Sequence, residues 1–211
     1  MPPIDAVVFD VGNVLLDWNP RHLFRKLFAD SERMEWFLAN ICTPAWNLEQ
    51  DRGRSFGEAV AELVARHPQW ELEIRVFDER WDETVAGEIP GSVELMRRLK
   101  DKVPLYAITN FSREKYARTR ERFAFLADFE GVVVSAHEGL LKPDLAIYRL
   151  FLDRYGLEAG RCLFIDDSQR NVEAAREIGM NAVQFLDAQG LARDLARFGV
   201  LEAPSASLPP A

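Results

Sequence analysis

The sequence contains few cysteines, no long apolar run and no excess of basic residues. Its two cysteines, Cys42 and Cys162, lie far apart among 211 residues, which disfavours a disulfide-stabilised fold and fits a cytoplasmic protein. No apolar run approaches the ~20 residues needed to span a bilayer, and the N-terminus lacks the basic region of a signal peptide. The formal net charge of −8 argues against nucleic acid or an anionic membrane surface as a partner.

The chain has enough apolar residues for a sizeable core, and its second half alternates between helix and strand patterns. Apolar residues make up 48% of the sequence, and 211 residues favour one domain or one core with an insertion. A first strand is expected at residues 4–10. The later elements are helices at 93–100, from 113, at 145–155 and at 169–178, and strands at 103–109, 131–135, 161–165 and 181–185. This alternation predicts an α/β fold with a doubly wound parallel sheet.

A helical segment interrupts this pattern after the first strand. Between about residues 20 and 86, apolar residues recur at helical spacing, as at Leu23, Phe24 and Leu27. All five tryptophans lie within this segment or just before it, so it can hold a small core of its own. We expect residues 1–16 and 89–211 to form the α/β core and residues 17–88 to form a small helical cap, which is well placed to act as a lid.

Carboxylates follow two of the expected core strands. Asp166 and Asp167 come directly after the apolar run at 162–165, and Asp10 follows the first strand. Asp10 alone is compatible with a turn, and helix capping explains one acid of the pair but not both. Ligands of an open parallel sheet gather outside the carboxyl ends of the strands. Three acids converging there indicate a hard cation, and Mg²⁺ is the usual choice beside a phosphate.

Two further polar sites stand at similar places. Thr109 and Asn110 end the second core strand, where a hydroxyl group can donate to a phosphate oxygen. Ser112 offers an ordinary interpretation of this segment, since it is a suitable N-cap for the helix that begins at residue 113. Lys142 precedes Pro143 and the next helix, and a single lysine in such a place is usually a surface residue.

The order of these features is more specific than any one of them. A strand with Asp10, a helical insertion, a strand with Thr109-Asn110, Lys142-Pro143 and a strand with Asp166-Asp167 together resemble the haloacid dehalogenase-like hydrolase superfamily. The resemblance covers residues 4–185 and is to subfamily I, in which a helical C1 cap follows the first motif of a Rossmann-like core. Four motifs match in order.

The resemblance implies roles for these residues. Asp10 is similar to the nucleophile that forms an aspartyl-phosphate, and Thr109 and Lys142 to the groups that hold the phosphoryl group. Mg²⁺ is then expected on Asp10, Asp166, Asp167 and the backbone carbonyl of Gly12. Phosphate and substrate contacts are expected from Gly12, Asn13, Thr109, Asn110, Lys142, Trp18 and Trp46.

One position departs from the family pattern. Most phosphatases of this family have an Asp two residues after the nucleophile, where it protonates the leaving group; this chain has Gly12. The Asp-x-Gly-Asn opening resembles that of some sugar-phosphate phosphatases. Asn13 can orient a water molecule but is not an acid at pH 7. His137 and Glu138 are the first alternatives for the acid, although a solvated loop is the favoured interpretation of both.

Substrate selection is expected from the cap. The favoured loop facing the site contains Trp46, Asn47 and the segment 51–53, and Trp18 follows the nucleophile loop. For each tryptophan, packing in the core of the cap is the competing and favoured interpretation. No motif fixes the substrate, and the chain is expected to be a monomer or homodimer.

These observations favour a Mg²⁺-dependent phosphatase that acts on a small phosphorylated metabolite, in particular a sugar phosphate, through an aspartyl-phosphate. A 2-haloacid dehalogenase shares the fold and nucleophile, but it has neutral residues at the fourth motif and a cap arginine where this chain has Asn40-Ile41-Cys42. A weakly active, phosphate-binding regulatory protein is a third hypothesis. Retention of all the charged motif residues disfavours it.

Overall fold

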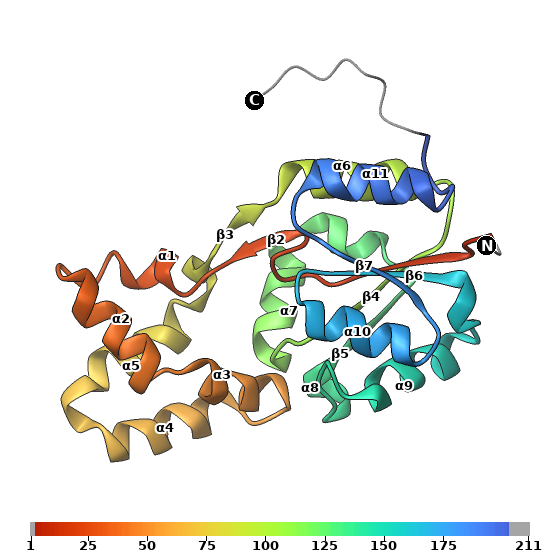
Figure 1. Cartoon of the computed structure of the whole chain (residues 1–211). Helices are drawn as coiled ribbons and strands as arrows, with labels where there is room; N and C mark the ends of the chain where they lie inside the picture. The colour runs from red at the N-terminus through yellow and green to blue at the C-terminus, as the bar shows by residue number, and fades with distance from the viewer. Residues whose placement is uncertain (1–2, 203–211) are drawn as a thin grey trace.

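A computed structural model describes residues 3–202. Its core is a five-stranded parallel sheet in the order β5-β4-β1-β6-β7 (Figure 1). The strands are β1 (Ala6–Phe9), β4 (Leu105–Thr109), β5 (Gly131–Val134), β6 (Cys162–Asp166) and β7 (Asn181–Gln184). Every residue of β1, β4 and β6 is buried, as expected for apolar strands covered on both faces. The predicted doubly wound sheet is confirmed.

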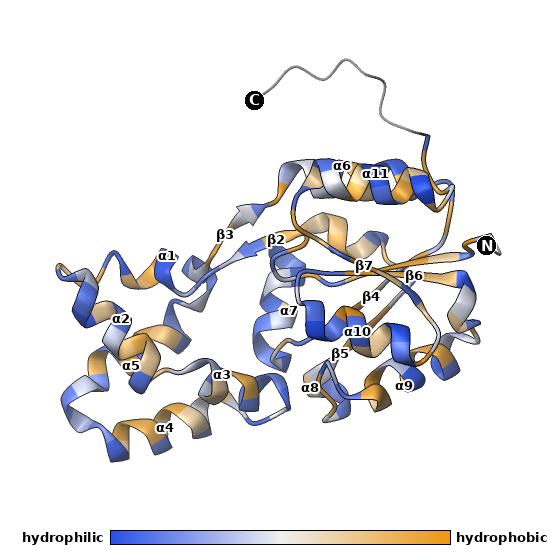
Figure 2. Ribbon diagram, in the orientation of Figure 1, coloured by the Kyte–Doolittle hydropathy of each residue, from blue (hydrophilic) through white to orange (hydrophobic). Residues whose placement is uncertain are grey.

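Helices cover both faces of the sheet. One face packs against α6 (Pro90–Leu99), α7 (Arg113–Arg122) and α11 (Ala188–Arg197), and the other packs against α9 (Leu145–Tyr155) and α10 (Gln169–Glu177). Alternate residues of β1 serve the two faces, because successive side chains of a strand point in opposite directions. Figure 2 shows the strands as mostly hydrophobic and the helices as hydrophobic on one side.

The chain leaves the core after β1 through a two-stranded antiparallel ribbon. The ribbon consists of β2 (Leu16–Trp18) and β3 (Val85–Glu88), which were not anticipated from the sequence. The cap helices lie beyond it, set apart from the sheet in Figure 1. They are α1 (Arg21–Phe24), α2 (Ser31–Asn40), α3 (Pro44–Asp51), α4 (Phe56–Arg66) and α5 (Glu71–Glu79). Four 3₁₀ turns complete the described elements: η1 (Pro68–Trp70), η2 (Trp81–Thr84), η3 (Ala124–Asp128) and η4 (Ala159–Arg161).

Two expected loops are instead helical. The segment from Trp46 to Asp51 belongs to α3, because the Thr43 side chain accepts a hydrogen bond from the Trp46 amide and Pro44 occupies the first helical turn. His137 and Glu138 belong to a short helix, α8 (Ser135–Glu138), that ends at Gly139 in the left-handed conformation.

Contacts between cap and core bury polar groups. Lys115 of α7 is buried, and its ammonium group donates to the backbone carbonyl of Asp78 (2.9 Å) and pairs with the carboxylate of that cap residue. The hydroxyl of Ser135, at the start of α8, donates to the carbonyl of Asp51 at 2.5 Å. These contacts fix the end of α5 and the end of α3 against the core.

Neither cysteine forms a disulfide, and both are buried. Within residues 3–202, no helix is both long enough and apolar enough to cross a bilayer.

The cap has an aromatic core centred on Phe77, whose side chain is 1% exposed. Its ring lies 5.6 Å from the rings of Phe24 and Trp46 and 6.3 Å from that of Phe56. We expect Phe77→Ala to lower the free energy of unfolding by about 3–5 kcal/mol, because truncation leaves a cavity among rigid rings. Urea denaturation followed by circular dichroism measures the change. Leu72→Ala, on the same helix but 70% exposed, is the matched control and should have little effect. Equal destabilisation by the two substitutions would contradict the assignment of Phe77 to the core of the cap.

Candidate active site

The site lies where the chain order of the sheet reverses. β1 occupies the centre, and the chain runs first to β4 and β5 on one side and later to β6 and β7 on the other. Such a switch point leaves a crevice at the carboxyl ends of the strands. Asp10, Thr109 and Asp166 stand at the ends of β1, β4 and β6 respectively, so three separate motifs meet at one place.

Lys142 joins two of these strand ends. Its ammonium nitrogen lies 2.8 Å from Oδ1 of Asp10 and 2.6 Å from Oδ2 of Asp166, and the lysine is 3% exposed. Asn110 holds the lysine backbone from both sides: its Oδ1 accepts from the Lys142 amide (2.8 Å), and its Nδ2 donates to the Lys142 carbonyl (3.0 Å). Lys142 is therefore a buried and anchored group, not the ordinary surface lysine that its sequence context alone indicated.

Three carboxylates gather around this lysine. One oxygen each from Asp10, Asp166 and Asp167 can be chosen so that all three lie within 4.8 Å of one another. Asp166 is fully buried, and its Oδ1 accepts from the Ser168 amide and the Asn171 side chain, both at 2.9 Å. These bonds fix the carboxylate in place. The donor set is all oxygen and anionic, which suits a hard divalent cation.

The electrostatics of the cluster show an excess of negative charge. Burial raises the pKa of Asp10 to about 7; Lys142 opposes this shift and Asp166 adds to it. Burial and the Asp166 charge likewise raise the pKa of Asp167. For Lys142, burial favours the neutral amine, but the two adjacent carboxylates outweigh it and raise its pKa. One ammonium group thus faces three acids, and an additional cation would relieve their repulsion.

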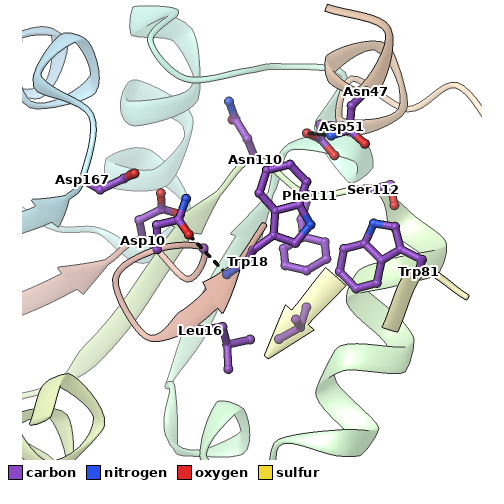
Figure 3. A pocket seen from close by; sticks show the side chains of 13 residues that line it. Asp10, Leu16, Trp18, Asn47, Asp51, Trp81, Asn110, Phe111, Ser112 and Asp167 are labelled. Carbon is purple, nitrogen blue, oxygen red and sulfur yellow. Dashed lines mark hydrogen bonds between the residues drawn. The ribbon is translucent and has the colours of Figure 1, made fainter. Parts of the chain in front are cut away.

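A pocket of about 190 Å³ opens above the cluster (Figure 3). Core residues, the β2–β3 ribbon and the cap all contribute to its wall. The lining residues are Asp10, Gly12, Asn13, Leu16, Trp18, Asn47, Asp51, Trp81, Val85, Asn110, Phe111, Ser112 and Asp167. The acids of the cluster therefore lie at one side, and aromatic rings together with cap residues lie at the other.

Three polar atoms around this pocket are buried without a hydrogen-bond partner. They are the indole Nε1 of Trp18, Oδ1 of Asn47 and the hydroxyl of Ser112. An unpartnered buried polar atom is costly in a folded protein, commonly about 1–3 kcal/mol. Their gathering in one pocket indicates that a polar ligand, or water, satisfies them. Ser112 occupies the N-cap position of α7, as expected, but its side chain makes no capping bond.

The structure brings most of the predicted site residues together. Asp10, Gly12, Asn13, Trp18, Asn110 and Asp167 line the pocket. Lys142 and Asp166 lie buried beneath it, and Thr109 ends β4 with 1% of its surface exposed. Asn13 has a positive φ of 56°, and its side chain accepts from the Trp18 amide at 3.2 Å. This contact ties the loop after Asp10 to β2.

Trp46 does not line the pocket. Its ring meets those of Phe56 and Phe77 edge-on, so it belongs to the core of the cap. Glu138 pairs with Arg154 at 2.7 Å and His137 packs edge-on against Tyr116, so neither faces the pocket. The wall residues Trp81 and Phe111 were missed from the sequence. Phe111 directly follows the Thr109-Asn110 motif, which is the one signal that could have found it.

A family model for haloacid dehalogenase-like hydrolases matches residues 4–179. The chain belongs to this family. It is therefore a hydrolase, as the order of its motifs predicted.

Relatives with related activities resemble this chain. A sesquiterpene phosphatase of Aspergillus oryzae is 29% identical over 197 residues, which cover 90% of this chain and 94% of that protein. Flavin mononucleotide hydrolase 1 of Arabidopsis thaliana is 33% identical over 113 residues, covering 53% and 46%. A family enzyme of Bacteroides thetaiotaomicron, crystallised with magnesium and inorganic phosphate, superposes with a TM-score of 0.69 at 20% identity, covering 86% of this chain and 93% of that one. This last likeness shows the shared fold.

Removal of the Lys142 charge should destabilise the folded protein. We expect Lys142→Met to lower the free energy of unfolding by about 3–5 kcal/mol, because two buried carboxylates lose their partner. Urea denaturation in EDTA measures this change without a compensating cation. Lys102→Met, at an exposed position, is the control. A variant as stable as the wild type would show that the ion pairs contribute nothing to folding.

Proposed function

We propose that this enzyme is a Mg²⁺-dependent phosphatase that hydrolyses a small phosphomonoester through an aspartyl-phosphate. The observation that carries the proposal is the environment of Asp10. Its Oδ1 accepts from the Val11 amide at 2.7 Å and contacts Lys142 at 2.8 Å. Both contacts involve the same oxygen, so Oδ2 is the atom available to attack phosphorus at the pocket floor.

Asp10, Asp166, Asp167 and the Gly12 carbonyl would hold the metal. The all-oxygen donor set and the unbalanced negative charge of the cluster support Mg²⁺. When bound, the ion supplies positive charge to a phosphate dianion that must approach an anionic nucleophile. The related enzyme from Bacteroides thetaiotaomicron was crystallised with both magnesium and phosphate, which is consistent with this assignment.

The chain's own groups account for the remaining steps. Asp10 attacks phosphorus and displaces the alcohol, and water then hydrolyses the acyl-phosphate that forms. Lys142 stays fixed against Asp10 and neutralises charge that accumulates on the phosphoryl oxygens. Asn110 orients Lys142 by two hydrogen bonds. Thr109, which ends β4 beside Asn110, would donate its hydroxyl to the phosphoryl group.

The pocket supports a compact substrate. Its volume of about 190 Å³ lies below the range of roughly 300–1,000 Å³ usual for drug-sized ligands. Trp18, Trp81 and Phe111 offer flat apolar surfaces, and the unpartnered atoms of Trp18, Asn47 and Ser112 offer hydrogen bonds. A small ring with hydroxyl groups, as in a sugar phosphate, uses both features.

Two observations disfavour the dehalogenase alternative. Without a bound cation, Lys142 alone would balance the charges of Asp10, Asp166 and Asp167. The described residues that line the pocket include no arginine to hold a substrate carboxylate. The regulatory alternative is disfavoured because the nucleophile, the buried lysine and the acid cluster lie together in one arrangement.

We expect Asp10→Asn to abolish phosphatase activity, because the amide is nearly isosteric but is not a carboxylate nucleophile. Phosphate release from p-nitrophenyl phosphate with Mg²⁺ measures the activity, and EDTA should stop it in the wild type. Asp153→Asn, an exposed aspartate on α9, is the control. Activity retained by Asp10→Asn would contradict the proposed covalent mechanism through Asp10. Chloride release from 2-chloropropionate in EDTA would instead support a dehalogenase.

A further inference from the structure

The pocket contains a third acid, which lies apart from the carboxylate cluster of Asp10, Asp166 and Asp167. Among the described lining residues, the carboxylates are Asp10, Asp51 and Asp167. Asp10 and Asp167 belong to the cluster, whereas Asp51 comes from the end of cap helix α3. Figure 3 shows Asp51 across the pocket from Asp10. A phosphoryl group on Asp10 would have its leaving oxygen directed away from Asp10, toward the cap.

Gly12 leaves the core without a proton donor on that side. It has no side chain, and a Cβ built there meets no atom within 4 Å, so the space beside the nucleophile is open. Gly12 is also not among the glycines with positive φ, so its backbone does not require glycine. The open position and the cap carboxylate face the same pocket.

Asp51 is held firmly in this position. Its carboxylate accepts a hydrogen bond from the Ser112 amide and one from Nδ2 of Asn47 at 3.3 Å. Its backbone carbonyl accepts from the Ser135 hydroxyl at 2.5 Å. Ser112 and Ser135 belong to the core, so two core residues set the place of an acid that the cap supplies.

The pKa of the Asp51 carboxyl group suits a general acid. Burial raises its pKa to about 7, and the Ser112 amide opposes the shift. An efficient general acid has a pKa near the working pH. Charged groups on neighbouring elements are engaged elsewhere: Arg113 donates to the Ala136 carbonyl, Glu114 accepts from the Phe56 amide, and His137 packs on Tyr116. Across the pocket, Asp10 and Asp167 are the acids that face it.

We propose that Asp51 is the general acid and base of this enzyme, in the role that Gly12 cannot fill. The proposal rests on the phosphatase function proposed above. In the first step Asp10 bonds to phosphorus, the phosphorus–oxygen ester bond breaks, and Asp51 gives its proton to the departing oxygen, so that a neutral alcohol leaves. In the second step the Asp51 carboxylate takes a proton from the water that attacks the aspartyl-phosphate, which releases phosphate and restores both acids.

The test compares leaving groups in Asp51→Asn. An alkyl phosphate leaves as a poor alkoxide and needs the proton, whereas p-nitrophenolate leaves without it. We expect kcat/KM for glycerol 2-phosphate to fall about 10²–10³-fold, and that for p-nitrophenyl phosphate to change only a few-fold. Glu49→Gln, an exposed acid on the same helix, is the matched control and should change neither.

The alternative role of Asp51 is a latch that holds the cap closed. A latch predicts that both substrates lose activity in parallel in Asp51→Asn, and that result would overturn the proposal. If wild-type enzyme with Mg²⁺ hydrolyses neither ester, the phosphatase function itself fails, which is a distinct outcome.

Two further measurements keep the proposal testable if Asp51→Asn does not fold. In the wild type, kcat/KM for the alkyl ester should fall as pH rises through about 7, where Asp51 loses its proton, while the aryl ester should not show this decline. Identical profiles would overturn the proposal. In the double variant Gly12→Asp with Asp51→Asn, an acid returns from the core side, and hydrolysis of the alkyl ester should recover relative to the aryl ester. If the folded double variant hydrolyses the alkyl ester no faster than Asp51→Asn does, loss of a proton donor is not the cause of the defect, and the proposal is overturned.

Discussion

The Lys142 ammonium group, held between the carboxylates of Asp10 and Asp166, is the contact on which the site depends. It lies 2.8 Å and 2.6 Å from the two acids and links the ends of β1 and β6 to the loop before α9. Buried ion pairs recover their desolvation cost only with good geometry and further hydrogen bonds. Asn110, after the end of β4, holds the Lys142 backbone, and Ser168 and Asn171, both at the start of α10, donate to Asp166. The charged centre is therefore a property of the whole sheet edge.

The parallel sheet explains why these motifs meet, and it also explains what the sequence could predict. Strands such as β1 and β6 could be predicted from the sequence because they are continuous apolar runs, as strands buried on both faces require. Once they are aligned in parallel, their carboxyl ends must share one edge, so Asp10 and Asp166 come together without any knowledge of side-chain packing. Helix α9 was predicted with its observed bounds, since Asp144 caps its start and Gly156 ends it.

The pocket wall was harder to predict, because it depends on packing between distant segments. Trp46 and Trp18 are both cap-side tryptophans with similar sequence surroundings, yet one packs between Phe56 and Phe77 and the other lines the pocket. The choice follows from the direction of α3, which begins after the Thr43 cap and includes Trp46 and Asn47, two residues expected in a loop. Trp81 lies in a 3₁₀ turn that leads into β3, so its position depends on the β2–β3 ribbon. The strands of this ribbon have only three and four residues, which is too short for a clear sequence pattern.

The arrangement divides the chemistry between core and cap. The groups assigned to the phosphoryl side come from the carboxyl ends of β1, β4 and β6 and from the loop that carries Lys142. The alcohol side is built from the ribbon, the cap and the start of α7. The placement of Asp51 couples the two halves, because its contacts to Ser112 and Ser135 exist only while α3 rests on the core. If the cap lifted, the acid would leave the pocket at the same moment that water entered it. With Asp51 as the general acid, proton transfer to the leaving group and exclusion of bulk water would then be one event, and chemistry on poor leaving groups would require the closed cap.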